Sequence, residues 1–246
     1  MTLAPGEIKA CCAAAYSSAA ARFLLGDSFH PGGAALTSRL ARALAVGAGD
    51  VVVDVACGPG TSAVQLARET GCEVIAVDLA PPPASDDPRV RLLRGDAEAL
   101  PLADASVDGA ICECALCTFP DKAAAARELA RVLRPGARLA LSDLTARADE
   151  LPESLRSLQA WVACIADARP LNEIAALIDR AGLVVEQTET HDDALGSLLE
   201  RIEARLKVAA LFGADEVARG RALVSEARRA LEQGRLGYGV VIGRRP

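Results

Sequence analysis

Short apolar runs alternate with segments of helical periodicity through the middle of the chain. Five such runs predict strands: Val51–Val55, Glu73–Val77, Val90–Leu93, a run within Ser106–Cys114, and Arg138–Leu141. Between them, Thr61–Glu69 and Asp121–Leu133 have the pattern of helices, the first stopped by Gly71 and the second closed by Pro135 and Gly136. Repeated strand–helix units predict a parallel sheet with right-handed crossovers.

Three further regions look helical. They are the residues before about 48, which break at His30-Pro31-Gly32-Gly33, residues 151–182, which divide near Pro170, and residues 193–233, which break near Gly213. Leu183–Glu189 and Tyr238–Ile242 supply two more strands. We therefore expect an α/β fold: a Rossmann-like, seven-stranded, mostly parallel sheet with helices on both faces and helical additions at the N-terminus and between the late strands. Residues 1–47 would form an N-terminal helical lid, and residues 48–246 the main domain with helical inserts near 146–170 and 193–233.

Composition narrows the classes of function. Of the 246 residues, 51% are hydrophobic but only 3% aromatic, so the core must be built from Ala, Val, Leu and Ile. The net charge of −6, without a Lys/Arg cluster, argues against nucleic acid as a partner. No apolar run approaches the roughly 20 residues that span a bilayer. The sequence shows no secretion signal, so we expect a cytoplasmic protein whose 8 cysteines are free thiols.

The most informative motif is Asp54-Val55-Ala56-Cys57-Gly58-Pro59-Gly60, which ends the first strand and opens a helix. Its glycines allow a tight turn and close approach of a ligand. Continued to Ala63, the loop also fits the dinucleotide pattern G-x-G-x-x-A. Two features favour S-adenosylmethionine (SAM) over NAD: Asp54 can receive the ammonium group of SAM, and Pro59 removes an N–H that a pyrophosphate needs. Asp78, at the end of the second strand, is placed to accept the ribose hydroxyls of either cofactor.

The order of these motifs carries a family resemblance. Asp54…Gly58…Gly60, then Asp78, then Asp96-Ala97, then Leu133-Arg134-Pro135-Gly136 resembles the class I SAM-dependent methyltransferases over residues 48–145. The resemblance implies SAM as the cofactor and contact of Asp96-Ala97 with adenine. The residues expected to hold SAM are Asp54, Ala56, Gly58, Gly60, Asp78, Leu79, Asp96, Ala97 and Glu113.

Three cysteines, Cys112, Cys114 and Cys117, follow or end the fourth strand, near the edge where ligands bind in open α/β sheets. Strand periodicity places Cys112 and Cys114 on one face. Small buried hydrophobes are the ordinary role of cysteine, and we expect it for Cys57, Cys72 and Cys112; a functional role stays open for Cys57 and Cys117. A zinc knuckle is disfavoured because no second ligand pair of matching spacing is present.

Three segments resemble the cysteine segments of arsenite methyltransferases: Ile8–Cys12, Glu113–Lys122 and Trp161–Ala168. This resemblance implies that Cys114 and Cys164, with Cys11 or Cys12, hold trivalent arsenic. Soft thiolates suit such an acceptor, and the arsenic lone pair can attack a methyl group without a general base. The chain departs from that family in its glycine loop, its shorter C-terminal region and its lack of a paired Tyr-Gly motif. The loop is more like those of small-molecule C- and O-methyltransferases.

Two alternatives therefore remain beside a metalloid substrate. One is a small-molecule C-, N- or O-methyltransferase with structural cysteines, which would need a base; Glu113, His30 and His191 are the candidates. The other is a non-catalytic thiol protein that binds SAM or a metalloid. Two roles are open for the aromatic residues Tyr16, Phe23, Phe29 and Trp161: they would line a substrate pocket, or they would pack in the hydrophobic core. The sequence predicts no particular oligomeric state.

Overall fold

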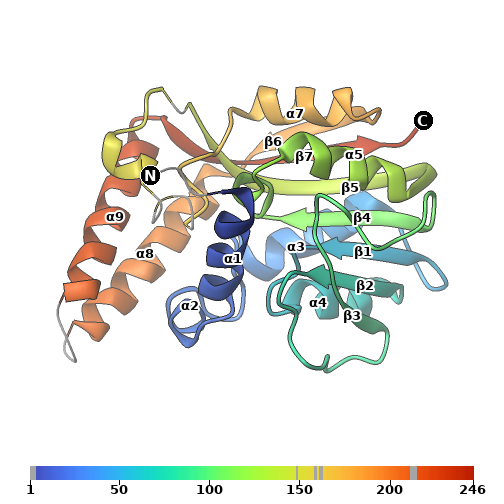
Figure 1. The fold of residues 1–246 in the computed structure, drawn as a ribbon, viewed down its shortest axis with the longest axis horizontal. Helices are drawn as coiled ribbons and strands as arrows, with labels where there is room; N and C mark the ends of the chain where they lie inside the picture. The colour runs from blue at the N-terminus through green and yellow to red at the C-terminus, as the bar shows by residue number, and fades with distance from the viewer. Residues whose placement is uncertain (1–3, 148, 158–159, 161–162, 211–214) are drawn as a thin grey trace.

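The structure is a computed structural model that describes residues 4–147, 149–157, 160, 163–210 and 215–246. Its centre is a seven-stranded sheet with the strand order β3-β2-β1-β4-β5-β7-β6 (Figure 1). The strands are β1 Val51–Val55, β2 Glu73–Asp78, β3 Val90–Arg94, β4 Val107–Glu113, β5 Leu133–Ala146, β6 Val184–Thr190 and β7 Leu236–Arg244. Strands β1 to β5 pair in parallel, whereas β7 runs antiparallel to both β5 and β6. The expected α/β, mostly parallel sheet is confirmed.

Helices cover both faces of this sheet (Figure 1). They are α1 Pro5–Tyr16, α2 Ala19–Leu25, α3 Gly33–Leu44, α4 Thr61–Thr70, α5 Lys122–Val132, α7 Leu171–Arg180, α8 Asp192–Ala209 and α9 Asp215–Glu232. Residues next to the helix ends determine where α4 and α5 begin and where α4 stops. The Asp121 side chain caps α5 by accepting from the Ala124 N–H at 2.8 Å, and Gly60 and Gly71 bound α4 with left-handed φ angles of 78° and 79°.

Two hydrophobic cores, one on each side of the sheet, hold the helices in place. Leu40 of α3 and Leu66 of α4 belong to one core, and Leu129 of α5 and Ile178 of α7 belong to the other. Along β1 the side chains alternate between the cores, as the strand period of two requires. Alanines fill much of the space under the helices, which is how a chain poor in aromatic residues packs closely against its sheet.

The structure corrects one expected element boundary. The strand expected at Arg138–Leu141 is the longer β5, which begins at Leu133 directly after α5, so Pro135 and Gly136 lie inside it. Pairing with β4 skips from Leu133 to Arg138, and this bulge accommodates a proline that cannot donate to the ladder.

The region 151–182 was expected to hold two helices. Among its described residues, Leu171–Arg180 form α7 after Pro170, Glu153–Arg156 form a short 3₁₀ turn, η2, and Ala160 is helical. Trp161 and the break expected near Gly213 lie outside the described residues.

Strand order places the site. The chain order reverses between β1 and β4, and such a switch point opens a crevice at the carboxyl ends of the strands. Helices α1, α2, α8 and α9 gather at that end of the sheet (Figure 1). No helix among the described residues is long and apolar enough to cross a membrane.

Candidate active site

One cavity at the switch point collects nearly all of the residues expected to hold the cofactor. Those that line it are Asp54, Ala56, Gly58, Asp78, Leu79, Asp96, Ala97 and Glu113. They come from the ends of β1, β2 and β4 and from the loop after β3, which parallel pairing brings to one edge. Gly60 is the exception, because it caps the start of α4 and is not part of this lining.

The glycine loop is fixed by Asp78. The Gly58 N–H donates to Asp78 Oδ2 at 2.9 Å, and the Ala80 N–H donates to Oδ1 at 2.8 Å. Ala56 and Gly58 both take left-handed φ angles, of 60° and 52°, and a non-glycine residue in this region is uncommon. A carboxylate has about four acceptor sites, so Asp78 retains capacity for ribose hydroxyls while it holds the loop.

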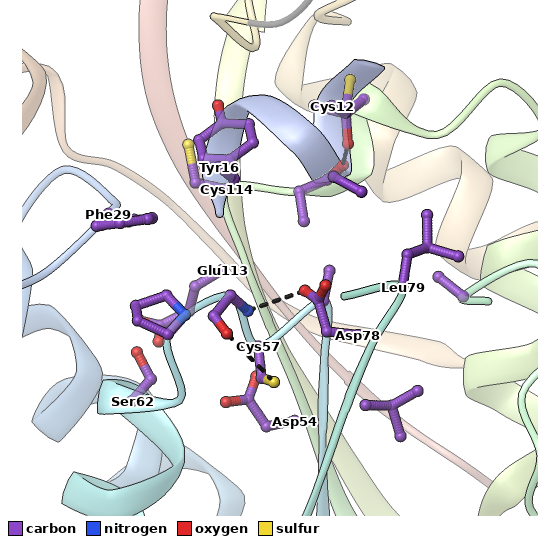
Figure 2. Close-up of a pocket in the computed structure, with 18 of the residues that line it drawn as sticks. Cys12, Tyr16, Phe29, Asp54, Cys57, Ser62, Asp78, Leu79, Glu113 and Cys114 are labelled. Atoms are coloured by element: carbon purple, nitrogen blue, oxygen red, sulfur yellow. Dashed lines mark hydrogen bonds between the residues drawn. The ribbon is translucent and has the colours of Figure 1, made fainter. Parts of the chain in front are cut away.

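Asp54 is a buried carboxylate in the lining of the cavity. It is 2% exposed, and its Oδ2 atom has no hydrogen-bond partner in the described part of the chain. Burial, followed by the nearby charges of Glu113 and Asp78, raises the pKa of Asp54 well above its usual range. Figure 2 shows Asp54, Asp78 and Glu113 around the loop at Cys57. A buried carboxylate oxygen without a partner, beside two more carboxylates, suits a cationic ligand group such as the ammonium of SAM.

His30 is buried beside these carboxylates. Its Nδ1–H donates to the Pro31 carbonyl at 3.0 Å, and its Nε2 lies 3.0 Å from the Ser28 hydroxyl. Glu113 accepts from the Thr37 hydroxyl at 3.0 Å and lies 3.5 Å from His30 Nε2. Both base candidates thus line the cofactor cavity.

The third base candidate, His191, is misplaced for that role. It pairs with Glu189 at 2.8 Å, just before α8, and is not among the described residues lining either cavity of the site. The sequence suggested His191 as a base only because the chain has 2 histidines.

Helix α1 forms one wall of the cofactor cavity through Lys9, Cys12, Ala13 and Tyr16. Lys9 Nζ lies 2.7 Å from Asp96 Oδ2 and 2.6 Å from Glu98 Oε2. Sequence reasoning missed Lys9 and the pairing role of Glu98, because nothing near Lys9 in the chain indicates partners 87 and 89 residues away.

A second cavity of about 270 Å³ adjoins the first. Its walls are leucine, valine and alanine side chains from α2, α8 and α9, and no Asp, Glu, His, Lys or Arg is among its described lining residues. Tyr16, Phe29 and Cys114 line both cavities. Figure 2 shows Tyr16 and Cys114 together, at the opposite end of the cofactor cavity from Asp54 and Ser62. Tyr16 and Phe29 therefore line the pocket, whereas Phe23 is 48% exposed.

Three cysteines, one of them Cys114 of this shared wall, lie together. Cys164 Sγ lies 3.0 Å from the Tyr16 hydroxyl and forms side-chain hydrogen bonds with Cys114 and Cys117. Donation from Cys114 first, then from Cys117 and Tyr16, lowers the pKa of Cys164 well below its usual range. The pKa values of the two donating thiols are raised, for Cys114 chiefly by this bond and for Cys117 chiefly by burial.

The two N-terminal cysteines have different environments. Cys12 is buried and lines the cofactor cavity, whereas Cys11 is exposed and lies outside the described lining of both cavities. Within the described ranges, no group of three or more His, Cys, Asp or Glu residues is arranged to hold a metal ion.

The expectation that Cys112 and Cys114 share a face is wrong. Cys112 ends up fully buried in the core under α5, whereas Cys114 packs against the opposite core. The reason is that β4 ends at Glu113 and Cys114 takes a left-handed φ of 53°, which interrupts the strand alternation. Cys72 is buried in an apolar core, as expected.

Comparison with known proteins gives a family match over the middle of the chain. Residues 53–141 match the family described as "Methyltransferase domain". This part of the chain is therefore similar to a methyltransferase domain. Together with the cradle for a cationic cofactor, this match supports a class I SAM-dependent methyltransferase with SAM as its cofactor.

The similar curated proteins are methyltransferases of different kinds. Methyltransferase GfsG of Streptomyces halstedii is 34% identical over 181 residues, covering 68% of this chain and 64% of the relative. Arsenite methyltransferase of Halobacterium salinarum is 29% identical over 160 residues, covering 61% of this chain and 41% of the relative. The chain thus spans less than two thirds of the length of these relatives.

Solved structures agree on the fold. Phosphoethanolamine N-methyltransferase 2 of Haemonchus contortus, solved with SAM, superposes with a TM-score of 0.77 at 16% identity, over 92% of this chain and 56% of that chain. Geranyl diphosphate C-methyltransferase of Streptomyces coelicolor A3(2) superposes with a TM-score of 0.75 at 17% identity, over 99% and 100%. At these identities the likeness shows the shared fold.

Proposed function

We propose that this protein transfers a methyl group from SAM to a small-molecule acceptor held in the apolar cavity. One observation carries the proposal: the carboxylate-lined cavity and the apolar cavity share Tyr16, Phe29 and Cys114 as a common wall. A charged cofactor and an apolar acceptor would therefore meet at that wall. The chemistry that SAM supplies when bound is an electrophilic methyl group on a sulfonium.

The residues of the chain would position the two reactants. Asp54 would take the ammonium, Asp78 the ribose hydroxyls, and Asp96 with Ala97 the adenine, so that the reacting end faces the shared wall. The apolar lining excludes water and orients the acceptor by shape. Holding two reactants in line is worth on the order of 7–11 kcal/mol of barrier, which is the main task of such a site.

The names of several relatives are consistent with a small organic acceptor. 27-O-demethylrifamycin SV methyltransferase of Amycolatopsis mediterranei is 33% identical over 169 residues, and demethylmenaquinone methyltransferase of Mycobacterium marinum is 38% identical over 105 residues. Both names specify organic molecules, and the apolar cavity fits that class better than a phosphate or a peptide.

The test is methyl transfer from isotope-labelled SAM to a panel of apolar phenols and quinols, with products identified by mass spectrometry. Transfer by the wild-type protein, with loss of SAM binding in Asp54→Asn, supports the proposal. Tight binding of NAD without binding of SAM contradicts it. Binding of SAM with no transfer to any acceptor would leave the non-catalytic thiol protein as the better description.

A second candidate acceptor is trivalent arsenic. The observation that favours it is the meeting of Cys114, Cys117 and Cys164 at the wall next to the cofactor cavity, with Cys12 in the lining of that cavity. In this case Cys114→Ser and Cys164→Ser each abolish methylation of arsenite, measured by mass spectrometry in the presence of a thiol, and leave SAM affinity nearly intact. Cys72→Ser is the matched control. Activity with phenols but not with arsenite excludes this candidate.

A further inference from the structure

The apolar cavity has a polar corner of its own, at Cys164. Cys164 lines this apolar cavity but does not line the cofactor cavity. The other titratable groups in that lining are Tyr16 and Cys114, and both are hydrogen-bonded to Cys164. Glu113 and His30 line only the cofactor cavity, so neither stands against an acceptor in the apolar one.

We propose that Cys164 is the catalytic base, and that the acceptor is a neutral apolar molecule with a weakly acidic hydroxyl, such as a phenol. This inference rests on the proposed methyl transfer to a small molecule. The apolar lining, which has no Asp, Glu, His, Lys or Arg among its described residues, favours the neutral form of the acceptor, and a neutral hydroxyl is a poor nucleophile until its proton is removed.

The surroundings of Cys164 provide for both of its protonation states. As a thiolate, it accepts from the Tyr16 hydroxyl at 3.0 Å and from the thiols of Cys114 and Cys117. As a thiol, it can donate to the Cys114 carbonyl oxygen at 3.4 Å. A base needs both arrangements, because it must be stable before and after it takes a proton.

The groups that face Cys164 come from several elements. On α1 these are Tyr16 and Cys12; after β4, Cys114 and Cys117; on α5, Lys122; and on β5, Asp143. Lys122 favours the thiolate through its positive charge and donates to the carbonyl of Cys117 at 3.1 Å. Asp143 opposes the thiolate when ionised, and the same repulsion, added to burial, raises the pKa of Asp143 to about 7.

Backbone geometry supports a built site. Cys164 has a left-handed φ of 65°, and its partner Cys114 has one of 53°. Non-glycine residues in this region cost free energy and concentrate at functional sites, because only surrounding packing keeps them there. Both side chains are thus held against the shared wall by the fold.

The reaction balances without a further reactant. The hydroxyl proton of the acceptor moves to Cys164 Sγ as the acceptor oxygen forms a bond to the methyl carbon. The bond between that carbon and the sulfonium sulfur breaks, and its electron pair stays on the sulfur, which leaves as neutral S-adenosylhomocysteine. The thiol then returns its proton to solvent.

The first test needs no acceptor. Ultraviolet titration of thiolate absorbance in the wild-type protein, minus that of Cys164→Ser, should show one thiol ionising below the ordinary cysteine pKa of about 8.5. Tyr16→Phe removes a donor and should move this ionisation to higher pH. A difference titration at or above the ordinary value overturns the proposal.

The second test compares two acceptors, a phenol with a pKa of about 10 and an electron-poor nitrophenol that is already ionised at the assay pH. Cys164→Ser should lose about 100-fold or more in kcat with the weakly acidic phenol and little with the nitrophenol, while binding S-adenosylhomocysteine as the wild type does. Cys72→Ser, outside both cavities, should retain activity with both.

The outcomes separate the two proposals. Equal loss of activity with both phenols, or no loss with either, overturns Cys164 as the base while methyl transfer to phenols stands. A wild-type protein that binds S-adenosylhomocysteine but methylates no acceptor overturns the proposed function and the base with it. If Cys164→Ser fails to fold, Tyr16→Phe decides: it should shift the pH profile of kcat for the weakly acidic phenol to higher pH, and an unshifted profile contradicts the proposal.

Discussion

Lys9 Nζ of helix α1 lies 2.7 Å from the Asp96 carboxylate in the loop after β3, and the same ammonium reaches Glu98 at 2.6 Å. The bridge joins the N-terminal helix to the segment expected to contact adenine. Because α1 also lines the cofactor cavity, the ion pair fastens one wall of that cavity. The lid expected at residues 1–47 remains a prediction.

Breaking this bridge should speed cofactor exchange. Lys9→Met removes two charge-assisted bonds from a partly exposed site, a loss of about 1 kcal/mol, which corresponds to about fivefold in the opening equilibrium. Stopped-flow fluorescence should show faster association and release of S-adenosylhomocysteine. Lys207→Met, which breaks an exposed pair with Glu203 on α8, is the matched control. Unchanged rates would show that α1 does not gate the cavity.

Affinity for SAM should rise with pH through ionisation of Asp54. Burial raises the pKa of Asp54 in the free protein, and the cofactor ammonium would stabilise its charged form. Binding at a pH below that raised pKa therefore releases a proton, so affinity increases as the pH climbs toward it. Calorimetry in buffers of different ionisation enthalpy measures the released proton. Asp54→Asn should weaken binding and abolish the release, and proton uptake on binding would contradict the assignment.

Asp78→Ala should act on both the cofactor and the loop. Loss of the carboxylate should weaken SAM binding by about 1–3 kcal/mol, as expected for a charged hydrogen-bond acceptor. It also leaves the Gly58 N–H without its partner, so the melting temperature should fall although the fold survives. Calorimetry and thermal unfolding measure the two effects. The exposed Asp86→Ala serves as the control, and unaltered SAM affinity in Asp78→Ala would remove this residue from the cofactor site.

Asp143 should make the protein less stable as pH rises toward neutrality. Its folded pKa of about 7, raised by burial and then by Cys164, exceeds the ordinary value of about 3.9, so the folded state holds a proton that the unfolded state has lost. The free energy of unfolding then falls as the pH rises from about 4 to about 7. The slope is up to about 1.4 kcal/mol per pH unit, as expected when the folded state binds one more proton than the unfolded state. Denaturant unfolding of Asp143→Asn should show a shallower slope, with the contribution of Asp54 remaining. Asp193→Asn, on the exposed surface, should keep the full slope; a wild-type slope of opposite sign would refute the argument.

Much of the fold and of the cofactor cradle was predictable from the sequence. Strand–helix alternation requires parallel pairing, and parallel pairing puts the carboxyl ends of strands at one edge. Three acidic residues lie at or after the end of a strand: Asp54, Asp78 and Asp96. Parallel pairing therefore predicts that they lie close together at this edge, and they line one cavity. Local chemistry also marked the cap at Asp121 and the glycines that bound α4.

Tertiary structure alone decided the acceptor side. Tyr16 and Cys164 meet although 148 residues separate them, and Cys117 joins them from a 3₁₀ turn, η1, at Leu116–Thr118. The separation of Cys112 from Cys114 depends on a single left-handed residue, which no strand period can foresee. Strand periodicity and turn residues act over a few positions, so they can be recognised from the sequence alone. Contacts between α1, the segment before α7 and the α8–α9 pair depend on how whole helices pack, and packing is settled only when the chain is folded.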